Sequence, residues 1–366
     1  MNYGKLLLTL SLIAVIFAGC AAPTTTPTST PTKTPEVIAL NGAGASFPYP
    51  LYSKWSSEYT KIKPNVQINY QSIGSGAGIR QIMERTVDFG ASDAPMSDAQ
   101  YANLTGILHI PTTIGAVVIV YNLPSVPSGL NLTGEVIADI FLGKIKKWSD
   151  PRITSINPGV VLPDHDIVVV HRSDGSGTTF VFSDYLSTIS QEWREKVGKG
   201  TSLNWPTGIG GKGNEGVAGI ISQNPYSIGY VELAYAKIQK IPYAKVKNQE
   251  GYFIEPSLES TRAAAAGAAP KLPKCHENWS RVSIVNPPGA NSYPIASFTY
   301  LLVYKDQEDQ AKGKALSEFI WWAIHEGQNY SPELLYVPLP QEVVKLNEEG
   351  IKLMNYKGEV FIKETK

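Results

Sequence analysis

Cysteine is nearly absent from this chain, which has only Cys20 and Cys275 among its 366 residues. Two cysteines cannot build the disulfide framework of a small secreted scaffold, and Cys20 stands in a terminal segment with a different role. We therefore expect no disulfide. The five histidines are scattered, and neither Cys275 nor His276 has a companion at a metal-ligand spacing, so we expect no metal site and no cofactor.

Net charge is also absent, because 32 Lys and Arg residues balance 32 Asp and Glu residues. Nucleic-acid-binding domains usually have a basic surface, and this sequence contains no long basic stripe. The cluster of Lys144, Lys146 and Lys147 beside Trp148 is more typical of a solvated face than of a nucleic-acid patch. We expect no nucleic-acid partner. A bound anion would have to be held by local dipoles and hydrogen bonds.

Motifs of catalysis are missing as well. Gly42-Ala43-Gly44 lacks the third glycine of a dinucleotide fingerprint. The turn at residues 73–78 and the segment 208–216 are glycine-rich, but neither has the Gly-Lys-Ser/Thr ending of a Walker loop. We find no nucleophile with a base and no set of metal ligands. The sequence therefore predicts a binding protein rather than an enzyme.

The N-terminal twenty residues indicate export. Lys5 precedes an apolar run at residues 6–17, and the small residues Ala18 and Gly19 lead to Cys20. The run is too short for a comfortable membrane span. The ending resembles a lipobox, which implies a lipoprotein signal peptide over residues 1–20 and lipidation of Cys20; an uncleaved N-terminal anchor is the alternative. Both place the protein on the outer face of the cell membrane, on the periplasmic or extracellular side.

Residues 21–36 are rich in Thr and Pro and almost uncharged. Such a composition cannot bury a core, so we interpret this stretch as an extended spacer. Folded sequence is expected from Val37 onward.

Strand patterns alternate with helix patterns along the remaining chain, which predicts an α/β fold. The long β-rich run at residues 107–121 is broken by Pro111 and Gly115, and we interpret it as a crossing between lobes. Other strands are expected at residues 38–41, 66–70, 87–90, 167–170, 228–231 and 297–304. Helices are expected at residues 51–59, 78–82, 132–143, 180–186, 217–223, 259–269, 313–327 and 342–354.

The turn after the strand at residues 167–170 combines the groups that suit a tetrahedral oxyanion. Arg172 supplies a planar double donor, Ser176 and Thr178 supply hydroxyls, and Gly177 lets a ligand approach the first N–H groups of a helix. The simpler alternative is that this turn only caps a helix and that Arg172 is a surface charge.

Two further turns have the same strand, small-residue turn, helix order, with Ser46 and Phe47 in the first and Ser75 in the second. Asp93 ends another short strand, and a buried carboxylate there would accept a hydrogen bond from a P–OH group but not favour sulfate. Alternatively, Asp93 caps the helix that follows. The glycine-rich segment 208–216 is expected to be a flexible stretch at the mouth of the cleft, and we assign it no contacts.

Five segments in this order resemble the high-affinity phosphate-binding proteins of the Pst ABC transporter. They are residues 42–48, 70–78, 88–95, 142–148 and 172–178. The resemblance runs from about residue 40 to about residue 340. It implies a two-lobed, periplasmic-binding-protein-like fold of class II type, with the ligand cleft between the lobes. One lobe would comprise residues 37–113 plus 292–366, and the other residues 114–291.

The resemblance also implies a set of ligand-binding residues. Asp93 would accept the phosphate proton, and Asp174 would support Arg172. The phosphate-binding set is Ser46, Phe47, Ser75, Asp93, Arg172, Ser176, Gly177 and Thr178. Two positions depart from the family pattern: Ser46 replaces a common Thr and keeps the hydroxyl, whereas Gly76 replaces a common Ser and removes one donor.

The sequence thus predicts an exported, membrane-tethered receptor, expected to be a monomer, that delivers inorganic phosphate to an ABC permease with a cytoplasmic ATPase. A receptor for another oxyanion, such as sulfate or molybdate, is the alternative. A secreted phosphatase would need the nucleophile or metal ligands that we do not find. A signalling or adhesion lipoprotein with the same pocket also stays open.

Overall fold

The structure, a computed structural model, describes residues 36–266 and 271–363. The predicted signal peptide, Cys20 and the spacer up to residue 35 lie outside the described residues. A compact unit begins at Val37, where the sequence predicts the start of the folded chain.

The elements alternate as the sequence predicts for an α/β fold. The main sheet contains β1 (Ile38–Gly44), β2 (Val66–Ser72), β3 (Phe89–Ser92), β4 (Ile107–Asn122), β6 (Val168–Arg172), β7 (Ile209–Gly211), β8 (Ser227–Glu232) and β11 (Ala296–Tyr304). Smaller sheets contain β5 (Asn131–Leu132), β9 (Lys245–Lys247) and β10 (Phe253–Ile254), and β12 (Asn355–Tyr356) with β13 (Glu359–Val360).

The helices are distributed along the whole described chain. They are α1 (Tyr49–Ile62), α2 (Ser75–Met83), α3 (Asp98–Ala102), α4 (Gly134–Phe141), α5 (Pro151–Thr154), α6 (Gly177–Ile189), α7 (Gln191–Lys196), α8 (Gly213–Gln223), α9 (Leu233–Ile238), α10 (Leu258–Ala265), α11 (Gln310–Ile324) and α12 (Gln341–Ile351). Short 3-10 helices follow α11 at Glu326–Tyr330 and Pro332–Leu334, so the predicted helix 313–327 ends earlier than expected.

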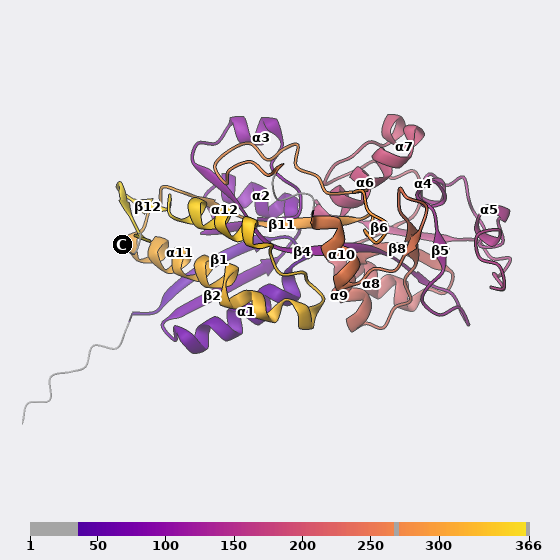
Figure 1. The fold of residues 1–366 in the computed structure, drawn as a ribbon, viewed down its shortest axis with the longest axis horizontal. Helices are drawn as coiled ribbons and strands as arrows, with labels where there is room; N and C mark the ends of the chain where they lie inside the picture. Colours follow the sequence, from indigo (N-terminus) through magenta and orange to yellow (C-terminus); the bar gives the residue numbers. More distant parts are fainter. Residues whose placement is uncertain (1–35, 267–270, 364–366) are drawn as a thin grey trace, which may run out of the picture. The chain divides into compact units, whose positions relative to one another are not determined.

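Two groups of strands are joined by β4. The strand order is β2-β1-β3-β11-β4-β8-β6-β7. We call β1, β2, β3 and β11 the first strand group, and β6, β7 and β8 the second. The first ten residues of β4 run antiparallel to β11 and the last six antiparallel to β8, so one strand crosses between the groups (Figure 1). This crossing was predicted from the sequence.

Pro111 does not break β4, contrary to the interruption that the sequence predicts. The register shifts opposite Thr299 and Tyr300, so that Thr112 is an extra residue on β4. Proline has no N–H and cannot donate a hydrogen bond to the neighbouring strand. The bulge therefore lies where regular pairing would in any case lack one hydrogen bond. Thr112 is fully buried and its hydroxyl lies 2.7 Å from the hydroxyl of Tyr52.

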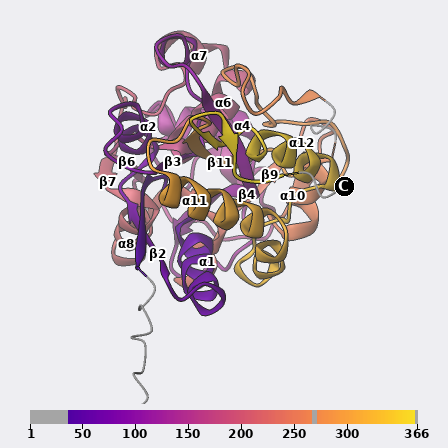
Figure 2. The same ribbon diagram turned by 90° about the vertical axis from the view of Figure 1, so that its left-hand side faces the viewer.

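Apolar spacing explains how the helices attach to the sheet. In α1 the buried side chains are Leu51, Tyr52, Trp55 and Tyr59, which share one face of the helix. The ring of Tyr59 packs edge-on against Phe319 of α11 at 5.2 Å between centroids, and Figure 2 shows the two helices side by side. These helices cover the first strand group.

Helix capping follows the sequence at several of these termini. Thr133 caps α4 by accepting from the N–H of Val136. Ser97, not Asp93, caps α3, in a capping box with Gln100. The capping alternative for Asp93 is therefore wrong, and its carboxyl is left for another role.

Candidate functional site

Four strand-turn-helix units direct helix N-termini to one region. The turn after β1 leads to α1, the turn after β2 to α2, the turn after β6 to α6 and the turn after β7 to α8. The first N–H groups of a helix have no intrahelical acceptor, and they lie at the positive end of its macrodipole. The predicted residues Ser46, Ser75, Ser176 and Thr178 belong to these turns, and each is no more than 1 % exposed.

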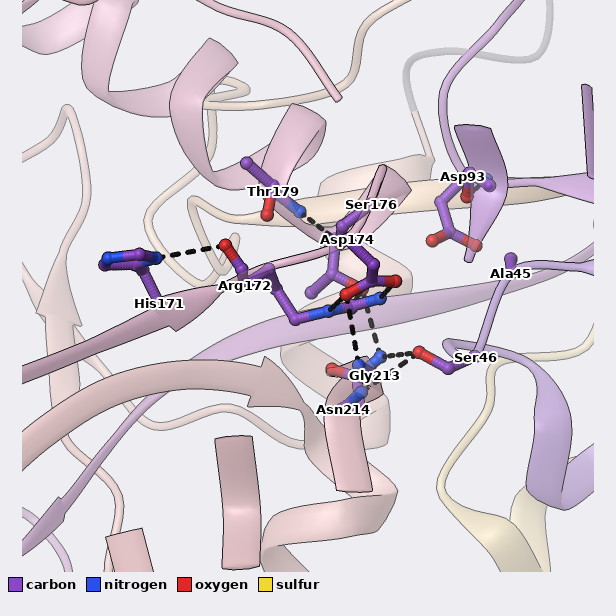
Figure 3. A network of polar contacts seen from close by, with 12 residues as sticks. Ala45, Ser46, Asp93, His171, Arg172, Asp174, Ser176, Thr179, Gly213 and Asn214 are labelled. Atoms are coloured by element: carbon purple, nitrogen blue, oxygen red, sulfur yellow. Dashed lines mark hydrogen bonds and ion pairs between the residues drawn. The ribbon is translucent and has the colours of Figure 1, made fainter. Parts of the chain in front are cut away.

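Arg172 is a buried cation, so the alternative of a surface charge is wrong. It is 3 % exposed, and its Nε and Nη2 donate to the two carboxylate oxygens of Asp174 at 2.8 and 2.6 Å (Figure 3). The N–H of Gly213 also donates to Asp174, at 3.1 Å. Burial would raise the pKa of Asp174, but the guanidinium and this N–H hold it below its usual range. The carboxylate therefore fixes the plane of the guanidinium, as the sequence predicts for a supporting residue.

Asp93 lies on the opposite side of the site from Arg172. Its Oδ1 accepts a hydrogen bond from the hydroxyl of Thr299 at 2.9 Å. Its Oδ2 faces the start of α6, because a Cβ atom placed on Gly177 would lie 2.5 Å from it. Burial raises the pKa of Asp93 to about 7, although the Thr299 hydroxyl and the charge of Arg172 act against this rise.

Ser176 both caps α6 and keeps a hydroxyl hydrogen for a ligand. Its Oγ accepts from the N–H of Thr179 at 3.0 Å, and its own N–H donates to the carbonyl of Thr201. The hydroxyl hydrogen is not used by either bond. The capping interpretation of this turn and the ligand-binding interpretation are thus compatible.

Glycines bring the two strand groups into backbone contact at the site. The N–H of Gly76 donates to the carbonyl of Gly175 at 2.9 Å. A Cβ on Gly74 would lie 2.3 Å from Asp174 Oδ2, and one on Gly177 would lie 2.5 Å from the hydroxyl oxygen of Ser75. Residues predicted from the sequence therefore lie against one another here, from both strand groups.

Asn214 is a site residue that sequence reasoning missed. The sequence predicts a flexible stretch at the cleft mouth for the segment 208–216 and assigns it no contacts, but the segment forms β7 and the first turn of α8. Asn214 is fully buried, and its Nδ2 donates to Ser46 Oγ at 2.8 Å and to Thr178 Oγ1 at 3.1 Å (Figure 3). A strand followed by a glycine-rich turn and a helix, as at the other three units, was the signal available in the sequence.

Two tyrosines and one glutamate also support the turn that holds Ser46 and Phe47. The hydroxyl of Tyr235 donates to the carbonyl of Ser46, and that of Tyr336 to the carbonyl of Phe47, both at 2.6 Å. Tyr336 also lies 3.1 Å from a carboxyl oxygen of the fully buried Glu232. These residues are distant in sequence from the turn, so no local pattern could associate them with it.

The lysine cluster near Trp148 lies outside this site. Lys144 pairs with Asp139 and Glu192, and Lys147 pairs with Asp164, on an exposed face. This agrees with a solvated surface. Cys275 is buried and not in a disulfide. A cavity of about 660 Å³ beside α10, lined in part by Arg281 and Pro288, contains none of the predicted ligand-binding residues.

Within residues 36–266 and 271–363, no cluster of His, Cys, Asp and Glu side chains could hold a metal ion. No helix in the same described part is long and apolar enough to cross a membrane. The site offers hydrogen-bonding groups: one guanidinium, several hydroxyls and the N–H groups of helix N-termini, with the buried carboxyl of Asp93 among them.

Comparison with known proteins gives the same picture over nearly the whole chain. A family model described as a PBP superfamily domain matches residues 23–326. The phosphate-binding protein PstS of Pasteurella multocida is 48% identical over 340 residues, covering 91% of this chain and 92% of the relative. PstS of Xylella fastidiosa is 49% identical over 314 residues, covering 84% and 83%.

Solved structures agree at the level of the fold. A phosphate-binding protein from Stenotrophomonas maltophilia superposes with a TM-score of 0.66 at 19% identity, covering 84% of this chain and 92% of that chain. The predicted two-lobed, periplasmic-binding-protein-like α/β fold is thereby confirmed.

Proposed function

Because the chain belongs to the PstS family of phosphate-binding proteins, we propose that it captures inorganic phosphate and delivers it to an ABC permease for import. The family is one of binding proteins, so the prediction that the chain is not an enzyme is confirmed. The relatives named for phosphate binding support phosphate over the alternative of sulfate or molybdate.

The phosphate would bind between the turns of the two strand groups. From the first group, the N–H of Phe47 and the hydroxyls of Ser46 and Ser75 would donate to phosphate oxygens, and Asp93 would accept. From the second, the Arg172 guanidinium would pair with phosphate oxygens, supported by Asp174. Ser176, Gly177 and Thr178 would donate from the N-terminus of α6. The burial of these residues and the contacts between the turns of the two strand groups support this assignment.

The lobe boundaries follow from the same proposal. Residues 37–113 plus 292–366 would form one lobe and residues 114–291 the other. The pairing of β4 with strands of both groups, and the return of the chain through β11, support these boundaries. Binding would close the lobes about the crossing strands.

The carboxyl of Asp93 is the observation that most favours phosphate. Its Oδ1 is occupied by Thr299, whereas its Oδ2 faces the start of α6. Near neutral pH phosphate keeps a proton that can be donated to this oxygen, whereas sulfate has none. A buried acceptor left without a donor costs free energy, so the site should reject sulfate.

The cellular setting is also proposed. The signal segment would direct export, and with the spacer it would tether a monomer to the outer face of the membrane through a lipid on Cys20. The loaded receptor would then meet a permease whose ATPase lies on the cytoplasmic side.

Calorimetric titration of the purified protein with phosphate and then sulfate tests the proposal. We expect tight binding of phosphate and no measurable heat with sulfate. Equal affinity for both anions would retain the receptor class but contradict phosphate selectivity. No binding of either anion would overturn the proposed function.

A further inference from the structure

Asn214, the second residue of α8, has a hydrogen-bond partner for every polar group of its side chain. Its Nδ2 donates to Ser46 Oγ at 2.8 Å and to Thr178 Oγ1 at 3.1 Å. Its Oδ1 accepts from the backbone N–H of Glu232 at 2.9 Å. Since that N–H can only donate, the amide oxygen must face it, and the orientation of the side-chain amide is fixed.

This orientation decides where the hydroxyl hydrogens of the site point. Ser46 Oγ accepts two hydrogen bonds from Asn214, from the side-chain Nδ2 and from the backbone N–H at 3.1 Å. Thr178 Oγ1 accepts from the same Nδ2 and lies 3.4 Å from Nη1 of Arg172. A hydroxyl has two lone pairs and one hydrogen, so both groups are left with a hydrogen to donate elsewhere.

We propose that Asn214 is a positioning residue that turns the hydroxyl hydrogens of Ser46 and Thr178 toward the bound anion. Ser46 follows a strand of the first group and Thr178 a strand of the second, so one buried amide acts on donors from both sides. The inference rests on the proposed function, because it takes phosphate as the anion. Asn214 itself does not need to touch the phosphate.

Asn214→Asp is the sharpest test, since it replaces an amide by a carboxyl of nearly the same shape. As a carboxylate it has no hydrogen to donate, so it would draw the hydroxyl hydrogens of Ser46 and Thr178 away from the ligand and add a negative charge. We expect phosphate affinity at pH 8 to fall at least 100-fold. At pH 5 the new carboxyl is protonated more often, because burial beside an anion favours the neutral acid, and part of the affinity should return.

The groups around position 214 bear on this pH dependence. They are Arg172 at the end of β6 with Asp174, Asp93 after β3, Glu232 at the end of β8, Tyr235 of α9 and Glu215 of α8. Phosphate and Asp93 titrate in the unaltered protein too. The quantity to compare is therefore the ratio of the dissociation constants of variant and unaltered protein for inorganic phosphate, measured at pH 8 and at pH 5.

Two further variants separate positioning from support of the fold. Asn214→Ala removes both donors without adding charge, and we expect a loss of about tenfold in affinity, about 1.4 kcal/mol, with a ratio that does not change with pH. Asn224→Asp adds the same charge at the far end of α8 and should bind phosphate as the unaltered protein does. Thermal unfolding of each variant shows whether it is folded.

The outcomes distinguish the inference from the proposed function. A ratio for Asn214→Asp that falls at least tenfold from pH 8 to pH 5 supports the positioning role. Unchanged affinity, or a loss equal at both pH values, overturns it while the phosphate function stands. Failure of the unaltered protein to bind phosphate overturns the proposed function itself, and the positioning role with it.

Discussion

The two oxygens of the Asp93 carboxyl face different neighbours, and this asymmetry underlies the selectivity that we propose. In the variant Asp93→Asn, the carbonyl oxygen of the new side chain can still accept from Thr299, and its amide hydrogens would face the ligand. The site would then consist of donors alone and suit sulfate. We expect the ratio of sulfate to phosphate dissociation constants to fall at least tenfold, which is about 1.4 kcal/mol. Competition titrations would measure it, and an unchanged ratio would contradict the role of Asp93.

Glu232 is a buried carboxyl outside the predicted ligand set. Tyr336 has one hydroxyl hydrogen, and the carbonyl of Phe47 at 2.6 Å is its nearer acceptor. The contact of 3.1 Å between Tyr336 and Glu232 is then best satisfied if the carboxyl is protonated and donates a hydrogen bond to the tyrosine oxygen. Burial and the nearby charge of Asp93 also raise the pKa of Glu232 well above its usual range. The hydrogen bond from the N–H of Ala234 lowers this pKa but does not cancel the rise.

This raised pKa predicts how stability depends on pH. The folded state holds the proton of Glu232 more firmly than the unfolded state, so the free energy of unfolding should fall as pH rises above the usual glutamate pKa. Glu232→Gln stays neutral and should show a smaller fall between pH 5 and pH 8 in urea titrations. The exposed variant Glu84→Gln is the control. A fall as steep in Glu232→Gln as in the unaltered protein would show that this carboxyl is not the cause.

At the residue scale, the sequence predicted the groups in the turns and the support of Arg172 by Asp174, but not the supporting residues that lie elsewhere in the chain. Arg172, Ser176 and Thr178 lie within one short segment, so composition alone associates them. Thr299 and Tyr336 reach the site from late in the chain, through strand pairing and packing that no local pattern contains. Asn214 lies in a glycine-rich segment after which the sequence predicts a helix from residue 217, whereas α8 already begins at Gly213.

At the scale of elements, the start of α6 depends on one residue having no side chain. A Cβ on Gly177 would meet Asp93 and the hydroxyl of Ser75, both at 2.5 Å. We expect Gly177→Ala to hold the two strand groups apart and to weaken phosphate binding at least 100-fold, with little change in the melting temperature of the ligand-free protein. Calorimetry and a thermal melt would check both. Near-normal affinity would mean that the site can widen without loss.

The sequence predicted the strands well where the apolar pattern was long, and it failed where contacts with distant parts of the chain determine the course of a strand. The boundaries of β4 and β11 follow their apolar runs closely. Pro111 would end a strand on local grounds, yet the extra residue Thr112 lets β4 continue. The shift depends on β11, nearly two hundred residues away in sequence, so it could not be predicted locally.

At the scale of the whole molecule, the proposed tether predicts where the protein is found. Cys20→Ser should remove the site of lipid attachment but leave the ligand site unaltered. We expect the variant to move from the membrane fraction to the soluble fraction and to bind phosphate with unchanged affinity. Retention in the membrane fraction would favour the uncleaved anchor instead.

The shared strand β4 has a consequence for how the molecule unfolds. Its first ten residues pair with β11 and its last six with β8, so both strand groups depend on the same continuous backbone. If one strand group unfolds and β4 unfolds with it, the other group loses the strand that pairs with its edge, β11 or β8. We therefore expect the lobes to lose structure together, in a single heat-absorption peak whose calorimetric and van't Hoff enthalpies agree. A binding protein built this way has two lobes in shape but one cooperative unit in folding.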